Sequence, residues 1–230
     1  MDESEFDQFA EEYRSMHASN IALSGESPEF FAEYKIADIA KRVQSLKLES
    51  GAILDFGSGV GNSIPHFRKL MPESELVCAD VSQKSLDLSE NRFPGQAQLH
   101  HIQGDSLSSL TQRFDVLFSA CVFHHIPQAE RRHWLEELRA IAKPGAMLAL
   151  FEHNPWNPLT LRAVNTCPFD VNASLLSAPQ LRRAVREAGW NDVETEFRIF
   201  FPGKLARLRP AERFLTWLPV GAQHVVYARA

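Results

Sequence analysis

The stretch Ile53-Leu54-Asp55-Phe56-Gly57-Ser58-Gly59-Val60-Gly61 is an apolar run that leads directly into a glycine-rich turn. The residues that follow it, 64–70, have a helical pattern. Glycine lets the backbone turn sharply and approach a ligand closely, because it has no Cβ. A strand, a glycine turn and a helix in this order predict a nucleotide-type binding site at the carboxyl end of a parallel strand.

The spacing of the glycines argues against a dinucleotide cofactor. A Gly-x-Gly-x-x-Gly turn seats a pyrophosphate at a helix N-terminus, but the sixth position counted from Gly57 is Asn62. Asp55 stands just before the turn, where its carboxylate would repel a pyrophosphate and attract a cation. S-adenosylmethionine carries an ammonium and a sulfonium, so it suits this turn better than NAD or FAD does.

Two further carboxylates follow in the order expected of an adenosine site. Asp80 ends the next apolar run about 25 residues after Asp55, where such folds place an acid on the ribose hydroxyls. Asp105 follows the third run, in Gly104-Asp105-Ser106, and could accept a hydrogen bond from an adenine amino group. Asp105 alone would be read as a turn residue, but the glycine turn and the two acids together predict one cofactor site.

The rest of the chain predicts an α/β fold. From Ala52 onward, short apolar runs alternate with amphipathic stretches, which is typical of a Rossmann-like, mostly parallel sheet with helices on both faces. We expect seven strands, at Ala52–Phe56, Leu76–Asp80, Gln98–Gln103, Phe114–Ser119, Ala146–Glu152, Val193–Phe201 and His224–Ala228.

Residues 1–48 precede this pattern and are predicted to form a helical leader to the main domain, residues 49–230. Ser27-Pro28 suits the start of a helix, and an apolar stripe follows it. Further upstream, aromatic and apolar residues recur at helical spacing, which indicates either a packed helix or a mobile lid; packing is the commoner role of such stripes. The downstream stripe is Ile36, Ile39, Ala40, Val43 and Leu46, and the upstream one is Phe6, Phe9, Tyr13 and Met16.

Two segments of the main domain break the alternating pattern. Residues 154–176 contain three prolines and little periodicity, which predicts a long loop or a cap insertion. Residues 200–221 mix aromatic and basic side chains, so they could form a cap, a contact for an anionic substrate or a membrane-surface contact. We expect a solvated helix with an apolar underside in this second segment.

Composition restricts the partners and the compartment. The chain has 230 residues, 44% of them hydrophobic, and a formal net charge of −5, which offers no general attraction to nucleic acid. The acidic start, residues 1–5, is unlike a signal peptide, and no apolar run approaches the roughly 20 residues that span a bilayer. Cys78, Cys121 and Cys167 form no Cys-x-x-Cys pair. We therefore expect a cytoplasmic protein with reduced thiols, no integral membrane segment and no nucleic-acid partner.

Over residues 51–151 the chain resembles the class I S-adenosylmethionine-dependent methyltransferases, especially the small-molecule group that includes the ubiquinone and menaquinone C-methyltransferases. The glycine turn matches the family's Asp-x-Gly-x-Gly-x-Gly motif, and Phe114–His125 and Leu138–Leu150 match its fourth and fifth motifs. The resemblance implies a seven-stranded sheet with an antiparallel last strand, S-adenosylmethionine as cofactor and S-adenosylhomocysteine as product. The cofactor contacts that it implies are Asp55, Gly57, Gly59, Gly61, Asp80, Val81, Asp105, Ser106 and Ala120.

Other methyltransferase motifs are missing. No Asn-Pro-Pro-Tyr-like element follows the fourth strand, as it would in amino-methylating DNA enzymes, and Asn154-Pro155-Trp156 follows the fifth strand instead. Cys167-Pro168 reverses the order of the Pro-Cys nucleophile of cytosine C5-methyltransferases. The sequence therefore favours a small-molecule acceptor, whose methylated atom could be oxygen, nitrogen or carbon. The aromatic leader and the aromatic and basic residues of 200–221 point to an apolar or lipid-linked acceptor.

Methyl transfer from a sulfonium is an in-line displacement that depends chiefly on alignment and exclusion of water. His125 is the predicted catalytic residue, either as a base or as a group that positions the acceptor; His124 is a weaker candidate. Glu152 and His153 form the next candidate pair. A metal site would need these four residues to converge, and adjacent histidines rarely share one ion, so we expect no metal.

Two other functions remain open on the sequence alone. A protein of this fold could bind the cofactor as a scaffold without turnover, although the intact Asp55, Asp80 and Asp105 argue against it. A nicotinamide-dependent oxidoreductase is the second alternative, which Asn62 weakens. A test of which cofactor binds distinguishes the oxidoreductase from the other two functions.

Overall fold

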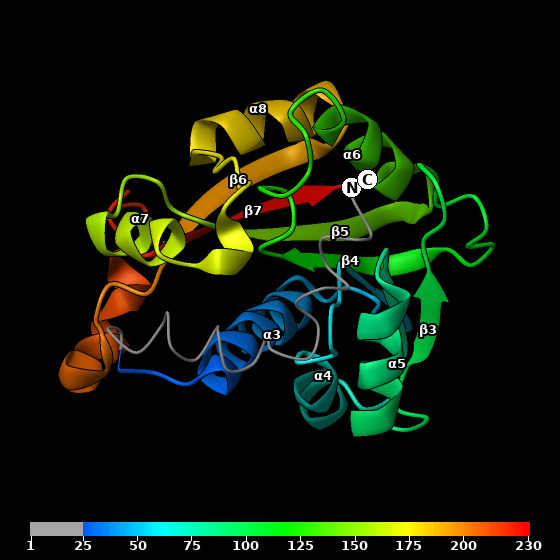
Figure 1. Ribbon diagram of the computed structural model, residues 1–230, viewed down its shortest axis with the longest axis horizontal. Coiled ribbons are helices and arrows are strands. Elements are labelled where there is room, and N and C mark those ends of the chain that lie inside the picture. Colours follow the sequence, from blue (N-terminus) through cyan, green and yellow to red (C-terminus); the bar gives the residue numbers. More distant parts are fainter. Residues whose placement is uncertain (1–24) are drawn as a thin grey trace.

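The computed structural model describes residues 25–230, which form one sheet covered by helices on both faces (Figure 1). The seven strands lie in the order β3-β2-β1-β4-β5-β7-β6, and β7 runs antiparallel to both of its neighbours. The expected α/β fold with an antiparallel last strand is therefore confirmed. The strands are β1 (Ala52–Phe56), β2 (Glu75–Asp80), β3 (Gln98–His101), β4 (Phe114–Ala120), β5 (Ala142–His153), β6 (Asn191–Arg198) and β7 (Gln223–Arg229).

The strand boundaries differ most from the sequence-based ones at the start of β5 and at the end of β6. β5 begins at Ala142 rather than at Ala146, because Ala142 already pairs with Phe114 before an irregularity in the register. β6 ends at Arg198 rather than at residue 201, because the next residue, Ile199, has a φ of 62°, which is outside the extended region.

Helices bury an apolar layer on each face of the sheet. On one face, α6 and α8 pack through Trp134, Leu138 and Leu181. On the other face, α3 and α4 pack through residues such as Ile39 and Phe67. The helices are α3 (Pro28–Leu46), α4 (Ile64–Leu70), α5 (Gln83–Arg92), α6 (Arg131–Ala140), α7 (Pro158–Asn165) and α8 (Ala178–Glu187), with 3-10 helices η2 (Pro168–Asp170) and η3 (Gly203–Phe214).

Helix α3 begins where the sequence predicted. Ser27 Oγ accepts a hydrogen bond from the amide of Phe30, and Pro28 occupies the first turn. Ile36, Ile39 and Val43 are buried against the sheet. This part of the leader therefore packs on the domain core. The upstream stripe of Phe6, Phe9, Tyr13 and Met16 lies outside the described residues.

The two irregular segments lie side by side. The insertion at 154–176 holds α7 and η2, and its Asn154 amide donates hydrogen bonds to the carbonyls of Pro219 and Gly221. Residues 200–221 contain a solvated helix, η3, as expected, but the expected apolar underside is absent: η3 buries none of its residues, and its backbone is non-helical at Leu205. Within residues 25–230, no helix has the length and apolar character that crossing a membrane requires.

Candidate cofactor pocket and the histidine cluster beside it

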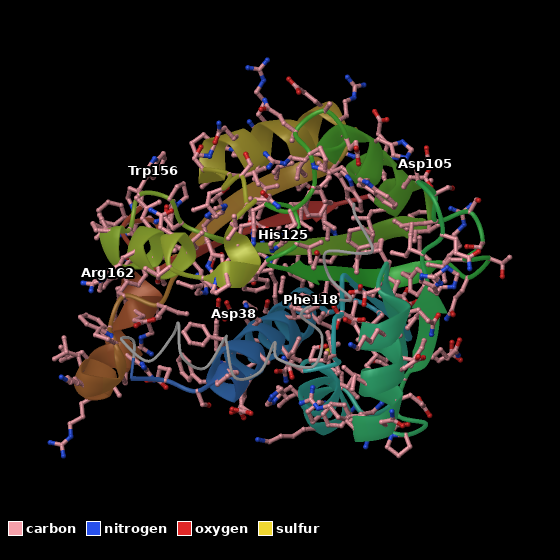
Figure 2. The ribbon with its side chains drawn as sticks, in the orientation of Figure 1. Asp38, Asp105, Phe118, His125, Trp156 and Arg162 are labelled. Carbon is pink, nitrogen blue, oxygen red and sulfur yellow. The ribbon has the colours of Figure 1, made fainter. Side chains whose placement is uncertain are left out.

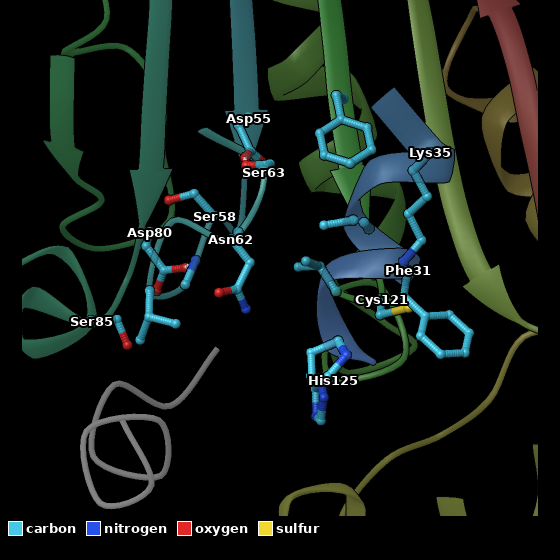
Figure 3. A pocket seen from close by; sticks show the side chains of 18 of the residues that line it. Phe31, Lys35, Asp55, Ser58, Asn62, Ser63, Asp80, Ser85, Cys121 and His125 are labelled. Atoms are coloured by element: carbon cyan, nitrogen blue, oxygen red, sulfur yellow. Dashed lines mark hydrogen bonds between the residues drawn. The ribbon is translucent and has the colours of Figure 1, made fainter. Parts of the chain in front are cut away.

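A cavity opens where the carboxyl ends of β1, β2 and β4 meet (Figure 3). The glycine turn after β1 forms one wall, and residues at and after the end of β4, including Ala120, Val122 and His125, form another. Helix α3 closes a further side with Phe31 and Lys35. The cavity is therefore lined by the predicted cofactor motifs and by the leader helix.

Two glycines of the turn serve different purposes. Gly57 has a φ of 74°, and a Cβ on it would lie 2.3 Å from Cγ2 of Val122, so no side chain fits between β1 and the loop after β4. Gly59 has a φ of 52°, but a Cβ on it would meet nothing within 4 Å. The absence of a side chain at Gly59 therefore leaves room for a ligand, whereas the absence of one at Gly57 lets Val122 pack against the turn.

Asp80 holds the glycine turn in place from the end of β2. Its Oδ2 accepts a hydrogen bond from the amide of Gly59 at 2.7 Å, and its Oδ1 accepts one from the amide of Ser82 at 2.9 Å. Burial raises the pKa of this carboxyl above its ordinary value. Asp80 and Val81 both line the cavity, so the carboxylate is available to a ligand as well as to the turn.

Asp55 is buried at the end of β1 and also lines the cavity. Its carboxylate accepts a hydrogen bond from the hydroxyl of Ser63. Burial raises the pKa of Asp55 to about 7, and the nearby Asp80 adds to the shift, while Ser63 and Lys35 oppose it. A cationic ligand in the cavity would favour the ionised form of this carboxyl.

Lys35 is a cavity residue that the sequence analysis did not identify. It is buried on the sheet-facing side of α3, between Phe31 and Ile39, and its Nζ lies 3.9 Å from Sγ of Cys121. The sequence signal for Lys35 is a lysine at helical spacing within an apolar stripe. A lysine is rarely buried unless it has a partner, so such a position indicates a role for the charge. The cavity thus contains a carboxylate, Asp55, and an ammonium, Lys35.

Three of the expected cofactor residues do not line the cavity. Gly61 packs against α5, where a Cβ would lie 2.2 Å from Oγ of Ser89. Asp105 is exposed near the edge of the molecule, far from His125 (Figure 2). Ser106 donates a hydrogen bond to Glu137 of α6. β3 ends at His101, so the chain has already turned away from the cavity at Asp105.

Beside the cavity, the loop after β4 is tied to the end of β5 by Glu152. Its Oε1 accepts hydrogen bonds from the amides of Val122 and Phe123, and its Oε2 lies 2.6 Å from Nδ1 of His124. His124 and Glu152 are both almost fully buried. The two facing carboxylates, Glu152 and Asp170, raise the pKa of His124 to about 10 despite its burial, and His124 holds the pKa of Glu152 at about 2.

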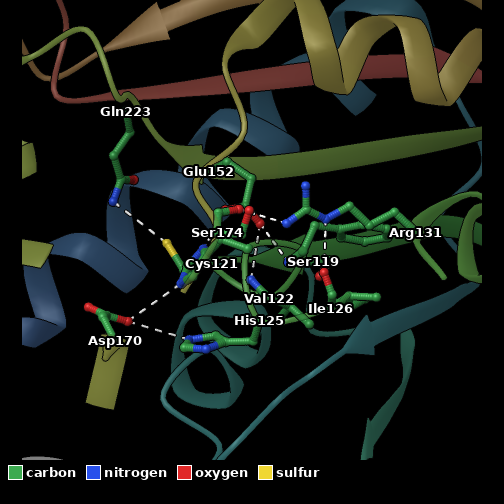
Figure 4. A network of polar contacts seen from close by, with 12 residues as sticks. Ser119, Cys121, Val122, His125, Ile126, Arg131, Glu152, Asp170, Ser174 and Gln223 are labelled. Atoms are coloured by element: carbon green, nitrogen blue, oxygen red, sulfur yellow. Dashed lines mark hydrogen bonds and ion pairs between the residues drawn. The ribbon is translucent and has the colours of Figure 1, made fainter. Parts of the chain in front are cut away.

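The insertion reaches this cluster through Asp170 of η2 (Figure 4). Its Oδ1 lies 3.4 Å from Nε2 of His125 and 3.6 Å from Nε2 of His124. Ser174 adds a hydrogen bond from its amide to the carbonyl of His124. Burial and the neighbouring His124 lower the pKa of His125 to about 4. The structure therefore brings together His124, His125 and Glu152, and adds Asp170, which the sequence analysis missed.

The central part of the chain is similar to a described family. Residues 54–148 match the family model described as a methyltransferase domain. A demethylmenaquinone methyltransferase of Lactobacillus johnsonii is 28% identical over 127 residues, which make up 52% of this chain and 51% of that protein. The chain thus spans about half the length of this curated relative, and 24% of the length of a second one, an uncharacterized protein of Synechococcus.

Solved structures extend the likeness to nearly the whole chain. A possible histamine N-methyltransferase of Thermotoga maritima superimposes with a TM-score of 0.66 at 16% identity, over 99% of this chain and 98% of that one. A plantazolicin methyltransferase, solved with a substrate analogue and S-adenosylhomocysteine, gives a TM-score of 0.63 at 14% identity, over 97% and 98% of the two chains. At these identities the likeness establishes a shared fold.

Proposed function

The chain has the class I methyltransferase fold and a methyltransferase-domain sequence at residues 54–148, and from this premise we propose that it transfers a methyl group from S-adenosylmethionine to a small-molecule acceptor. The observation that carries the proposal is the set of groups in one cavity: the open face of Gly59, the carboxylates of Asp55 and Asp80, and the ammonium of Lys35. Gly59 leaves room for the cofactor. The three charged side chains match its ribose hydroxyls, its ammonium and its carboxylate.

We assign each of these groups a part of the cofactor. Asp80 lines the cavity beside the glycine turn that it holds at Gly59, and its carboxylate oxygens can accept hydrogen bonds from the ribose hydroxyls. Asp55 pairs with the ammonium of the methionine moiety, and Lys35 pairs with its carboxylate. Val81 and Ala120 line the same cavity. Asp105, Ser106 and Gly61 stay outside this assignment because they do not reach the cavity.

When bound, S-adenosylmethionine would supply an electrophilic methyl group on its sulfonium, and its transfer to the acceptor would leave S-adenosylhomocysteine. The protein's part is to align the two reactants and to exclude water. Phe31 and Val122 give the cavity apolar walls, and His125 provides a polar side chain in the wall after β4. We propose that His125 contacts the acceptor.

We propose an apolar or amphipathic acceptor. The insertion and the C-terminal segment adjoin each other and expose large apolar side chains, including Trp156, Leu159 and Trp217. Lys204, Arg207 and Arg213 lie in the same C-terminal segment. Such surfaces favour a ligand with an apolar body and an anionic group. We place the reaction in the cytoplasm, where the three free cysteines stay reduced.

Isothermal calorimetry on the whole chain tests the cofactor, with NAD as the control ligand. We expect micromolar binding of S-adenosylmethionine and S-adenosylhomocysteine and no binding of NAD. Preference for NAD would support the oxidoreductase instead. Turnover is tested by incubating the protein with methyl-labelled S-adenosylmethionine and either a small-molecule extract or RNA and DNA. Label that enters only the small-molecule fraction supports the proposal, and cofactor binding without any label transfer supports the scaffold.

A further inference from the structure

Three nitrogen and oxygen atoms from two distant segments face a common point beside the cavity. One possible ligand atom from each of His124, His125 and Asp170 lies within 4.8 Å of the other two. The histidines follow β4, and Asp170 comes from η2 in the insertion. We propose that these three side chains bind one divalent transition-metal ion, for which Zn²⁺ is the best match.

The two distances from Asp170 to the histidines are close to those between two ligands of one ion. Asp170 Oδ1 is 3.4 Å from Nε2 of His125 and 3.6 Å from Nε2 of His124, whereas N–H···O hydrogen bonds span about 2.7–3.2 Å. Two ligands at about 2.0–2.1 Å from a tetrahedral zinc are separated by about 3.3–3.4 Å. The carboxylate and the two imidazoles therefore need only a small movement to close on one ion.

Glu152 orients His124 as a metal ligand. Metal-binding histidines usually direct their second ring nitrogen to a carboxylate, which fixes the ring and leaves the other nitrogen for the ion. Glu152 Oε2 lies 2.6 Å from Nδ1 of His124, and the same carboxylate is anchored by the amides of Val122 and Phe123. The ring of His124 is therefore held with Nε2 toward Asp170.

The set of side chains selects the class of metal. Two imidazole nitrogens and one carboxylate oxygen are typical of zinc and of other first-row transition metals, not of calcium or magnesium. Three protein ligands leave the fourth tetrahedral position open, as in catalytic zinc sites. Because His125 also lines the cofactor cavity, an ion held by this cluster would lie beside that cavity, where its open position could accept an oxygen, nitrogen or sulfur atom of the acceptor.

We expected no metal because four residues would have to converge and because adjacent histidines rarely share an ion. The structure bears on both reasons. The ring centroids of His124 and His153 are 5.3 Å apart and Glu152 contacts His124, so the four candidate residues do converge. The adjacent rings of His124 and His125 are 4.2 Å apart at 46°, an arrangement that lets both reach Asp170. Metal binding does not depend on the proposed function; only the role of the open position toward an acceptor rests on it.

Calorimetric titration of the chelator-treated whole chain with ZnCl₂ tests the site, together with elemental analysis after dialysis. We expect one zinc per chain. Asp170→Asn and His125→Gln should each weaken zinc binding at least tenfold, and Glu152→Gln by about 10–100-fold, as loss of an orienting carboxylate does. His133→Gln, which alters a histidine on α6 outside the cluster, is the matched control and should bind zinc as the natural chain does.

Cobalt gives a second readout that needs no variant. Co²⁺ bound to the natural chain should show the intense visible absorption of a four-coordinate ion, and zinc should displace it. Zinc binding that is absent, or that is lost in His133→Gln and unchanged in Asp170→Asn, would overturn the proposal. S-adenosylmethionine binding is measured in the same samples, so failure of the metal site and failure of the cofactor site remain distinguishable.

Discussion

The carboxylate of Asp80 accepts a hydrogen bond from the amide of Gly59 at 2.7 Å, which joins the end of β2 to the turn after β1. The same carboxylate accepts a second bond from Ser82, at the N-terminus of α5. One side chain therefore shapes the glycine turn and faces the ligand cavity, so its replacement should affect both binding and local stability.

Asp80→Asn should weaken S-adenosylmethionine binding at least tenfold. An amide offers one acceptor oxygen instead of two, so either Gly59 or Ser82 loses its partner, and the ribose loses a charged acceptor. The lost backbone bond should lower the free energy of unfolding by about 1 kcal/mol. Calorimetry and urea unfolding measure the two effects. Asp105→Asn is the control: its carboxylate is exposed and outside the cavity, so its affinity should stay within about twofold of the natural chain's.

S-adenosylmethionine should bind more tightly as the pH rises from 6 to 8. The pKa of Asp55 is about 7 in the ligand-free protein, and the ionised carboxylate is the form that pairs with an ammonium. Binding near pH 7 should therefore release a proton, which calorimetry in buffers of different ionisation enthalpy detects. Asp55→Asn should remove this pH dependence. Methylthioadenosine lacks the ammonium, so its affinity should not change with pH; an equal change for both ligands would contradict the assignment.

The same carboxyl should make the ligand-free protein less stable as pH rises. Because the pKa of Asp55 is raised on folding, the folded chain holds this proton more tightly than the unfolded chain does. The contribution of Asp55 to the free energy of unfolding is therefore present below pH 4 and declines between about pH 4 and 7, by at most about 4 kcal/mol. Asp55→Asn should flatten this part of the stability profile, as thermal unfolding across pH measures.

Alanine at two nearby glycines should have different effects, chiefly on stability at Gly57 and on cofactor binding at Gly59. Gly57→Ala should lower the free energy of unfolding by more than about 2 kcal/mol, because a left-handed backbone and contact with Val122 both oppose the methyl. Gly59→Ala should cost only about 1 kcal/mol, because its methyl meets no atom, but it should weaken cofactor binding. Unfolding and calorimetry check the pair. A Gly59→Ala chain that keeps full affinity would show that the cofactor does not approach this turn.

Lys35→Met should weaken S-adenosylmethionine binding about tenfold, because the cavity loses its paired cation for the methionine carboxylate. Lys35→Arg should retain part of the affinity. Decarboxylated S-adenosylmethionine is the sharpest probe: it should bind the natural chain and Lys35→Met about equally. Lys41→Met, on the exposed side of the same helix, is the matched control and should leave both affinities unchanged.

The local sequence predicted those features whose cause is local. Ser27 and Pro28 start α3 because a capping hydroxyl and a proline in the first turn act within a few residues. The strand β1 and its glycine turn are likewise encoded in one short stretch, and Asp80 follows from the regular spacing of the next strand. The order of apolar runs was enough to predict the α/β fold, since each run has to find a place in one sheet.

The sequence did not predict the positions of site residues that depend on packing between distant parts of the chain. Lys35 was missed because only the packing of α3 against the sheet turns this lysine into the cavity. Asp105 was expected at the cofactor because its position after the third strand fits, but β3 ends early and the backbone carbonyl of Asp105 is held by His133. Spacing in the sequence does not record where a strand ends or which contacts hold the loop that follows it.

By itself, the sequence determined the α/β fold, the glycine turn and the acids Asp55 and Asp80, because hydrophobic periodicity, turn chemistry and the succession of apolar runs along the chain are properties of short segments. Only the tertiary structure decided that His124, His125 and Asp170 meet at one point beside the cavity. The physical reason is that Asp170 reaches the histidines through an insertion whose path depends on packing and on hydrogen bonds such as that from Ser174 to His124, none of which has a local signature.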